Sequence, residues 1–312
     1  MTRTQGTLLV IGATTLWGLN GSLSKVLLND ALTSTQLTQI RVSGAFALLL
    51  LGVLATRPAT LRATLGQIVY LVVFGLFGLT AVQLLYFLAL ERLQIGVALL
   101  IEYLAPVLVA LYARFVLKDR VGCGLWIGIV LVLVGLALML DVAGGDVPEL
   151  AGLAFAFSAA FAYALYILMT DRIKAERPPV ATITWGFGVS ALFWLIVQPL
   201  WSFPFGSLNQ SIDLGGNLSG TTVSGWVLVG AVVVFGTVLP FAMLVSSLHA
   251  LPAARVTLIA TFEPVAAALF ARLWLGQQLD TVQLLGGALV MAGIVAAELA
   301  SVHKDAAPAA PP

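Results

Sequence analysis

Long apolar stretches, separated by short polar connections, run along almost the whole chain of 312 residues. Each stretch is close to the about 20 residues that a helix needs to cross a bilayer, and none alternates with the period of two of a barrel strand. Because lipid offers the backbone no hydrogen-bond partner, helices are the remaining spanning structure. The pattern predicts an all-α membrane protein with ten transmembrane helices, at residues 7–28, 36–56, 66–89, 94–116, 122–140, 150–170, 180–202, 223–247, 253–275 and 280–299.

Composition agrees with this interpretation. Hydrophobic residues make up 60% of the chain, charged residues make up only 9%, and the mean hydropathy is +1.05. A soluble domain of this length could not bury so much apolar surface in one core. The chain is therefore expected to reside in a lipid bilayer.

The basic residues predict the orientation of the spans. The basic residues named below all fall on one side of the membrane, whereas the stretches 29–30, 141–149, 203–222 and 276–280 on the other side contain no Lys or Arg. By the positive-inside rule the basic side is cytoplasmic, and so are both termini. We expect a multi-pass protein of a bacterial inner membrane, with these cytoplasmic residues: Arg3, Arg57, Arg62, Lys118, Arg120, Arg172, Lys174, Arg177 and Lys304.

An internal repeat divides the chain into halves. Residues 99–138 align without a gap to residues 257–296, and 13 of the 40 paired positions are identical, including Pro106 with Pro264. These segments hold the fourth and ninth spans, which cross in opposite directions. The sequence predicts two inverted five-helix repeats, at 6–141 and 149–300, followed by a disordered cytoplasmic tail at 301–312. Inverted repeats are typical of alternating-access transporters, although a duplication without mechanistic meaning is the alternative.

Ionisable residues inside the hydrocarbon are candidates for function, because each is destabilising unless it is paired or hydrated. Arg41, Glu102 and Glu263 lie within predicted spans, and Lys25 lies near the outer end of the first. At about 1.5 Å per residue, Glu102 lies roughly 12 Å and Arg41 roughly 8 Å below the outer surface. Together they could bind the ammonium and the carboxylate of one substrate. The alternative is a structural ion pair between them.

Two prolines occupy corresponding positions in the halves. A proline within a helix removes one backbone hydrogen bond and frees a carbonyl for a substrate or water. Pro106 and Pro264 are therefore candidates for helix breaks or gates beside a central cavity, with simple packing kinks as the alternative. Glu263 directly precedes Pro264 and is a candidate proton carrier or substrate contact. A hydrated side chain facing the cytoplasm is the other interpretation.

Further polar and aromatic residues interrupt the apolar spans. Hydroxyl, amide and indole groups on apolar bodies suit the lining of a substrate cavity. Interfacial belts and interhelical packing are the more frequent roles of membrane Trp and Tyr. The candidate lining residues are Trp17, Asn20, Gln83, Tyr86, Tyr103, Tyr163 and Tyr166.

Several function classes lack their usual sequence features. The chain has one cysteine, Cys123, and two histidines, His249 and His303, neither beside an acidic partner in sequence. It has no phosphate-binding loop ending in Lys and no serine nucleophile elbow. A net charge of +1 gives no nucleic-acid footprint. We therefore expect no metal, no cofactor, no nucleic-acid partner and no enzymatic activity.

Several motifs resemble those of a known family. The ten-helix layout and these motifs are similar to the EamA-type drug/metabolite transporters, over residues 6–300. The segments 100–106 and 261–264, with a Glu four residues before the first proline, most resemble the threonine/homoserine exporter group. The motifs are Leu16-Trp17-Gly18, Ile40-Arg41, Leu104-Ala105-Pro106, Ala162-Tyr163-Ala164-Leu165-Tyr166 and Glu263-Pro264.

The resemblance implies a central cavity lined by helices 1, 3, 4, 6, 8 and 9, and export of amino acids or related metabolites. The chain departs from the family where a Gly-Glu pair often ends helices 4 and 9, since it has Lys118-Asp119 and Gly276-Gln277. We expect a secondary exporter of small zwitterionic metabolites, with protons as candidate coupling ions. The alternatives are an exporter of aromatic or cationic compounds, a membrane-embedded enzyme and an accessory membrane protein. Substrate identity, direction of transport and oligomeric state stay open.

Overall fold

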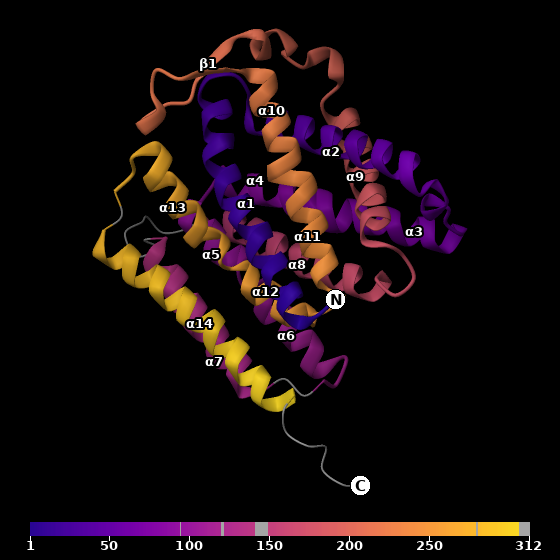
Figure 1. The fold of residues 1–312 in the computed structure, drawn as a ribbon, viewed down its shortest axis with the longest axis vertical. Coiled ribbons are helices and arrows are strands. Elements are labelled where there is room, and N and C mark those ends of the chain that lie inside the picture. The colour runs from indigo at the N-terminus through magenta and orange to yellow at the C-terminus, as the bar shows by residue number, and fades with distance from the viewer. Residues whose placement is uncertain (94, 120–121, 141–148, 279, 306–312) are drawn as a thin grey trace.

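The computed structural model describes residues 1–312 except 94, 120–121, 141–148, 279 and 306–312. These residues are almost entirely helical (Figure 1), apart from one short antiparallel pair of strands, β1 (Ser211–Asp213) and β2 (Thr222–Ser224). Short 3-10 turns occur at Pro58–Leu61, Leu200–Ser202, Phe205–Asn209 and Gly216–Leu218. The α-helices are α1 (Arg3–Asp30), α2 (Ser34–Thr56), α3 (Leu65–Val73), α4 (Ala81–Leu90), α5 (Ile95–Glu102), α6 (Ala105–Phe115), α7 (Cys123–Met139), α8 (Leu150–Ile173), α9 (Pro179–Val197), α10 (Gly225–Val233), α11 (Leu239–Ser247), α12 (Ala253–Ala260), α13 (Glu263–Leu275) and α14 (Thr281–Asp305).

Many of these helices are long and apolar enough to cross a membrane. Among the described residues, seven helical stretches meet both criteria, and Cys123–Met139 and Thr281–Ala297 are apolar but shorter. This confirms an all-helical, multi-pass membrane fold, while the count of ten spans stays a prediction. The seven stretches are Ser34–Thr56, Leu65–Leu90, Val97–Phe115, Leu150–Ile173, Pro179–Val197, Gly225–Ser247 and Ala253–Leu275.

The first three helices begin at the same local motif. Thr2, Thr33 and Thr64 each accept a hydrogen bond from the backbone N–H of a Gln three residues later, and the side chain of that Gln accepts one from the threonine N–H. This reciprocal capping box satisfies two backbone donors that a helix start leaves unpaired, and such a cap contributes about 1 kcal/mol. The motif fixes where these helices enter the bundle.

Two boundaries differ from those expected. Helix α9 ends at Val197, before the predicted residue 202, because Gln198 precedes Pro199 and is extended, with φ −133° and ψ 93°. A residue before proline is driven out of the helical region in this way. At the other end of the chain, α14 continues to Asp305, which lies inside the segment expected to be a disordered tail. Residues 306–312 of that segment lie outside the described residues.

Two of the predicted spans are broken at corresponding positions. The fourth span consists of α5 and α6, separated at Tyr103 and Leu104, and the ninth consists of α12 and α13, separated at Thr261 and Phe262. The two breaks coincide at the spacing of 158 residues that relates the repeats. In each half the second helix carries a proline in its first turn, where its missing N–H leaves no intrahelical bond unmade.

Two other helices contain a π-helical turn at corresponding positions. The turn η2 (Phe74–Thr80) joins α3 to α4, and η7 (Val234–Val238) joins α10 to α11. Both contain a Phe-Gly pair, at Phe77-Gly78 and Phe235-Gly236, which differ by the same 158 residues. π turns are uncommon and occur frequently at functional sites. Their recurrence extends the likeness of the halves beyond the aligned segment.

Helices α7 and α14 lie side by side in Figure 1, in contact through glycines. A Cβ on Gly128 would lie 2.7 Å from the carbonyl oxygen of Gly293, and one on Gly135 would lie 2.6 Å from that of Gly286. The earlier glycine of one helix thus meets the later glycine of the other, so the helices run antiparallel. Small residues of this kind let membrane helices approach closely.

The loop between α9 and α10 covers one end of the bundle, at the top of Figure 1. The Asp213 carboxylate accepts hydrogen bonds from Gly215 N at 2.6 Å and from Gly220 N at 2.7 Å, which folds the loop on itself. The indole of Trp274 in α13 donates to the carbonyl oxygen of Leu214 at 2.9 Å. The loop is therefore attached to the last turn of α13.

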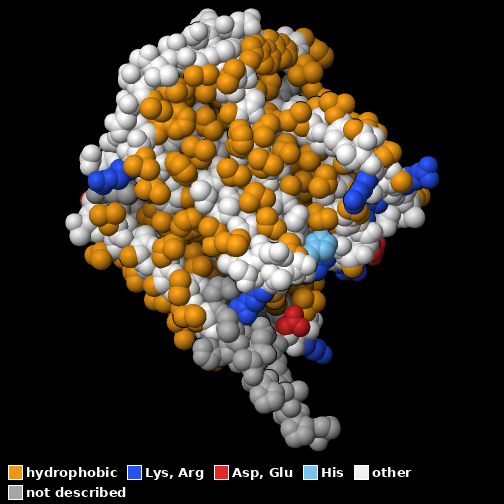
Figure 2. Space-filling model, in the orientation of Figure 1, with side chains coloured by type: hydrophobic (Ala, Val, Ile, Leu, Met, Phe, Trp, Pro, Cys, Tyr) orange, Lys and Arg blue, Asp and Glu red, His pale blue; other side chains and the backbone are white. Residues whose placement is uncertain are grey.

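The surface agrees with a membrane setting. Figure 2 shows hydrophobic side chains spread across the middle of the visible face, with the coloured charged side chains toward its edges. A band of exposed apolar residues of this extent is unusual for a soluble monomer. Large exposed residues include Leu51, Val69, Phe77, Phe161, Leu192 and Ile196.

Candidate functional site

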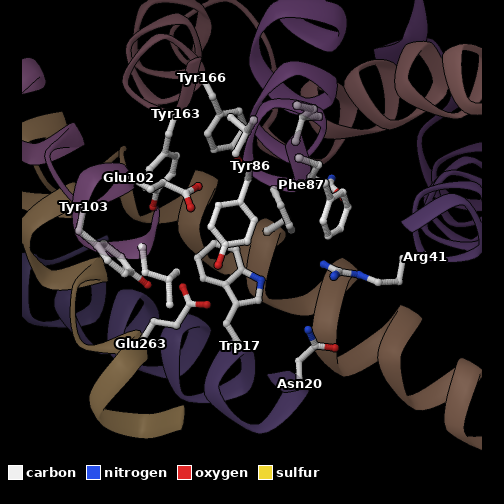
Figure 3. A pocket seen from close by; sticks show the side chains of 15 residues that line it. Trp17, Asn20, Arg41, Tyr86, Phe87, Glu102, Tyr103, Tyr163, Tyr166 and Glu263 are labelled. Carbon is white, nitrogen blue, oxygen red and sulfur yellow. The ribbon is translucent and has the colours of Figure 1, made fainter. Parts of the chain in front are cut away.

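A cavity of about 300 Å³ lies inside the helical bundle (Figure 3). It is bounded by parts of α1, α2, α4, α5, α8, α11 and α13, by η2, and by the break after α5. The structure brings all ten residues that the sequence analysis proposed for substrate binding to its wall. The lining residues are Trp17, Asn20, Arg41, Leu79, Val82, Gln83, Tyr86, Phe87, Leu99, Glu102, Tyr103, Tyr163, Tyr166, Phe241 and Glu263.

One end of the cavity is acidic. Glu102 is the last residue of α5 and Glu263 is the first residue of α13, so both carboxylates lie where a helix is interrupted. In Figure 3 the hydroxyl of Tyr103 points toward the Glu263 carboxylate. In Figure 3 the two carboxylates point into the same side of the cavity, together with the ring of Tyr163. This end can accept hydrogen bonds from a cationic group.

The other end of the cavity is basic. The guanidinium of Arg41 points into the cavity from the side away from the two carboxylates, and Asn20 lies below it in Figure 3. Arg41 Nε donates a hydrogen bond to Thr237 Oγ1 at 3.3 Å. Within the part of the chain that the structure describes, no ion pair links Arg41 to Glu102 or Glu263. The structural ion pair weighed as an alternative is therefore absent from this conformation.

Aromatic rings line the wall between the charged ends. Trp17 meets Phe241 edge to face at a centroid distance of 5.2 Å, and Phe241 meets Tyr166 in the same way at 6.0 Å. Tyr166 also stacks on Phe74 at 5.5 Å, which fixes its ring. Its hydroxyl is buried and has no hydrogen-bond partner among the described residues. Such a wall supplies apolar contact with few competing polar groups.

The two prolines lie close to the cavity but not in its wall. Pro106 and Pro264 are buried in the first turns of α6 and α13, and neither lines the cavity. The helices are interrupted two to three residues earlier, at Tyr103-Leu104 and Thr261-Phe262, beside the positions of Tyr103 and Glu263 in the cavity wall. A role for the prolines in gating stays a prediction.

Some wall residues were not expected from the sequence. Leu79, Val82, Phe87, Leu99 and Phe241 are apolar residues in apolar spans, where nothing distinguishes a cavity wall from a lipid contact. Thr237 does not line the cavity but contacts Arg41, and it too lies inside an apolar run. The one signal that marks its position is Phe235-Gly236, which repeats Phe77-Gly78 at the repeat spacing.

The known proteins that this chain resembles are transporters. The model of the EamA-like transporter family matches the chain twice, at residues 4–141 and 150–298. The threonine/homoserine exporter RhtA of Escherichia coli strain K12 is 29% identical over 244 residues, which cover 76% of this chain and 74% of that protein. The uncharacterized transporter YwfM of Bacillus subtilis is 25% identical over 304 residues, or 97% of each chain.

A solved structure shares the fold. One crystal structure superimposes with a TM-score of 0.75 at 20% sequence identity, covering 96% of this chain and 98% of the other. At that identity the likeness concerns the arrangement of the helices alone.

Proposed function

The chain belongs to the EamA-like transporter family, and on that premise we propose that it is a secondary exporter of small zwitterionic metabolites, most of all amino acids. It would act by alternating access across a bacterial inner membrane. Relatives described as threonine/homoserine exporters support the amino-acid class.

The observation that carries this proposal is the separation of charge in the cavity. Glu102 and Glu263 lie at one end and Arg41 lies at the other, with aromatic rings between them (Figure 3). Unpaired charges in a membrane interior are strongly destabilising, so a set of opposite charges held apart suggests a ligand that pairs with both. An amino acid offers an ammonium to the carboxylates and a carboxylate to the guanidinium. A cavity of about 300 Å³ accommodates such a molecule.

We further infer that the two halves, 6–141 and 149–300, have opposite topology. Helices α7 and α14 are equivalent under the repeat, and their glycine contacts support an antiparallel pairing. With α1, α7 and α14 counted as spans, each half has five and both termini are cytoplasmic. A reporter fused after Lys174 should then be cytoplasmic and one fused after Gly206 external. An external C-terminus would contradict the ten-span topology.

Glu263 is also the group we propose for coupling to protons. It sits at a helix break, where freed backbone groups and cavity water can reach it. A carboxyl in such a place can take up a proton when the substrate's ammonium leaves. Export would then be driven by proton entry.

A second candidate function is export of aromatic or cationic compounds. The wall formed by Trp17, Phe241 and Tyr166 favours it, since rings of this kind bind apolar and cationic groups. Arg41 opposes a purely cationic substrate, because it would be left unpaired beside a second positive charge. A membrane-embedded enzyme gains no support from the named relatives, whose described function is transport.

Counterflow in proteoliposomes tests the proposal. Vesicles containing the purified protein are loaded with one unlabelled amino acid at a time and diluted into the same compound in labelled form. We expect transient accumulation for L-threonine, L-homoserine or a similar amino acid, and a change in net flux under an imposed pH gradient. Protein-free vesicles and Glu102→Gln vesicles are the controls. Counterflow of quaternary ammonium dyes without counterflow of any amino acid would favour the second candidate instead.

A further inference from the structure

The π turn η7 holds a threonine against the basic end of the cavity. Thr237 is 2% exposed, and its hydroxyl donates to the carbonyl oxygen of Val232 at 3.1 Å, five residues earlier. The hydroxyl oxygen itself, Thr237 Oγ1, accepts a hydrogen bond from Arg41 Nε at 3.3 Å. Because the hydroxyl proton of Thr237 is donated to Val232, its oxygen can act only as an acceptor toward Arg41. The turn therefore aims an acceptor at the guanidinium.

The neighbouring glycine brings a second polar residue to the same turn. A Cβ on Gly236 would lie 2.0 Å from Oδ1 and 3.0 Å from Cβ of Asn20, so the Asn20 side chain could not keep its present place beside η7. Glycine thus permits the close approach of α1 to η7. The pair Gly236-Thr237 organises both polar residues at the basic end, Asn20 and Arg41.

The contact leaves a defined part of Arg41 free for a ligand. A guanidinium has five N–H donors, and Nε is occupied by Thr237. The two terminal amino groups have no ion-pair partner among the described residues, and Arg41 lines the cavity. Two terminal groups held in one plane form the end-on fork that binds a carboxylate through two parallel hydrogen bonds.

We propose that Thr237 is a positioning residue that sets the Arg41 guanidinium so that its terminal fork forms the carboxylate site of the cavity. The proposal rests on the proposed function as far as the ligand is an amino acid. The positioning itself concerns only Thr237 and Arg41. Lysine at position 41 could not replace this arrangement, because an ammonium has neither an Nε donor nor a planar fork.

The first half of the chain contains a matched control. Thr80 lies in the other π turn, is also 2% exposed, and donates to the carbonyl oxygen of Gly75 at 2.8 Å, again five residues earlier. No hydrogen bond to a charged side chain is found for it in the described structure. Replacing either threonine by valine removes one hydroxyl from one π turn, but only Thr237→Val removes a partner of Arg41.

The first experiment observes the hydrogen bond directly. Protein labelled with ¹⁵N-arginine is reconstituted in lipid nanodiscs, and the Arg41 Nε–H resonance is assigned from its loss in Arg41→Lys. We expect this proton to be protected from exchange in the unmodified protein, in Thr237→Ser and in Thr80→Val, and unprotected in Thr237→Val. Thr237→Ala takes the place of Thr237→Val if valine prevents folding. Protection that persists without the hydroxyl would overturn the proposal.

The second experiment tests the carboxylate site. L-threonine and L-threoninamide, which keeps the ammonium but lacks the carboxylate, compete for counterflow by each variant. Thr237→Val loses a hydrogen bond that orients a charged group. The apparent affinity for L-threonine should therefore fall about three- to tenfold, while the apparent affinity for the amide stays unchanged. Thr80→Val should keep the ratio of affinities for L-threonine and L-threoninamide that the unmodified protein has. In an Arg41→Lys background, Thr237→Val should cause no further change in that ratio. An equal loss for both compounds would assign Thr237 a purely structural role.

The two experiments separate the two claims. If the unmodified protein transports no amino acid while protection of Arg41 depends on Thr237, the proposed substrate class fails and the positioning stands. If amino-acid counterflow is robust and Thr237→Val prefers L-threonine over its amide as strongly as the unmodified protein does, the proposed carboxylate site at Arg41 is wrong. The proposed amino-acid export then stands.

Discussion

The two halves of the chain share a backbone design but differ in their chemistry. In both, the fourth helix of the half breaks two residues before a proline, and the third contains a π turn. Yet the carboxylates fall on opposite sides of the break. Glu102 ends α5, where its counterpart in α12 is Ala260, and Glu263 begins α13, where its counterpart in α6 is Ala105. The two halves therefore share the position of the break but not the position of the carboxylate.

The π turns show the same division. Thr80 and Thr237 make the same hydrogen bond to a carbonyl five residues earlier. In the part of the chain that the structure describes, only Thr237 also accepts a hydrogen bond from a charged side chain, because Arg41 in α2 approaches η7. Equal local structure therefore does not imply equal function in the two halves.

The largest effect is expected where the halves meet. A Cβ on Gly135 would lie 2.6 Å from the carbonyl oxygen of Gly286, so Gly135→Ala should force α7 and α14 apart and destabilise the protein by about 1–3 kcal/mol. Gly286→Ala should do the same, because it meets the same contact from the other side. Thermal unfolding followed by size-exclusion chromatography measures this loss.

Gly230 in α10 provides the control for that experiment. A Cβ there would contact nothing within 4 Å, so Gly230→Ala should keep or slightly raise the unfolding temperature, since alanine favours the helix. Equal unfolding temperatures for Gly135→Ala and Gly230→Ala would show that α7 and α14 are not packed through their glycines.

The next effect concerns the carboxylate of the first half. Glu102→Gln keeps the shape of the side chain but removes the charge at the acidic end of the cavity. Counterflow of the substrate should fall at least tenfold, as expected when a buried partner of an ammonium is neutralised, while membrane expression stays unchanged. Full activity in Glu102→Gln would remove this residue from the site.

The carboxylate of the second half should behave differently. Glu263→Gln cannot release a proton, so it should abolish accumulation driven by a pH gradient and leave downhill exchange of substrate largely intact. Parallel measurements of gradient-driven uptake and of exchange separate the two activities. If Glu263→Gln accumulates substrate as well as the unmodified protein does, protons are carried elsewhere.

A smaller effect is expected at a connection that the halves do not share. Arg177 is 5% exposed and donates to the carbonyl oxygens of Thr60 at 2.7 Å and Arg62 at 3.0 Å, so it holds the loop between α2 and α3. Burial lowers the pKa of this guanidinium from its usual value, with Glu176 acting in the opposite direction. The corresponding loop of the second half is longer and folds on itself through Asp213 instead.

Arg177→Lys keeps the charge but cannot reach both carbonyls in the same geometry. We expect a loss of about 1–2 kcal/mol in stability, because buried acceptors lose their donors, and little change in transport per folded molecule. Arg57→Lys, at an exposed position in the same loop, is the control. A transport defect that exceeds the stability loss would give this loop a part in the conformational cycle.

Much of the cavity could be predicted because polarity inside a membrane is rarely accidental. Arg41, Glu102 and Glu263 stand out in apolar spans, and the tyrosines and Trp17 follow from the same reasoning. Thr237 could not be distinguished in this way, since a threonine in a helix usually bonds its own backbone, as Thr170 does to Tyr166. Its contact with Arg41 depends on how α2 packs against η7, which no local pattern encodes.

The helix breaks were predicted less well than the residues around them. Proline marks the region, but the backbone leaves the helix at Leu104 and Phe262 rather than at Pro106 and Pro264 themselves. Proline is well tolerated in the first turn of a helix, so it favours a new helix start as much as a kink. Only the tertiary structure decides between those two outcomes.

Competition by analogues that lack one charge tests the central claim, that opposite ends of one cavity bind opposite charges of one substrate. Counterflow of L-threonine is measured against its amide, which lacks the carboxylate, and against 2,3-dihydroxybutyrate, which lacks the ammonium. We predict that neither analogue inhibits L-threonine counterflow well in the unmodified protein. Arg41→Gln should reduce only the difference in apparent affinity between L-threonine and its amide. Glu102→Gln should reduce only the difference in apparent affinity between L-threonine and the hydroxy acid. Strong competition by either analogue in the unmodified protein, or identical effects of the two substitutions, would contradict the claim.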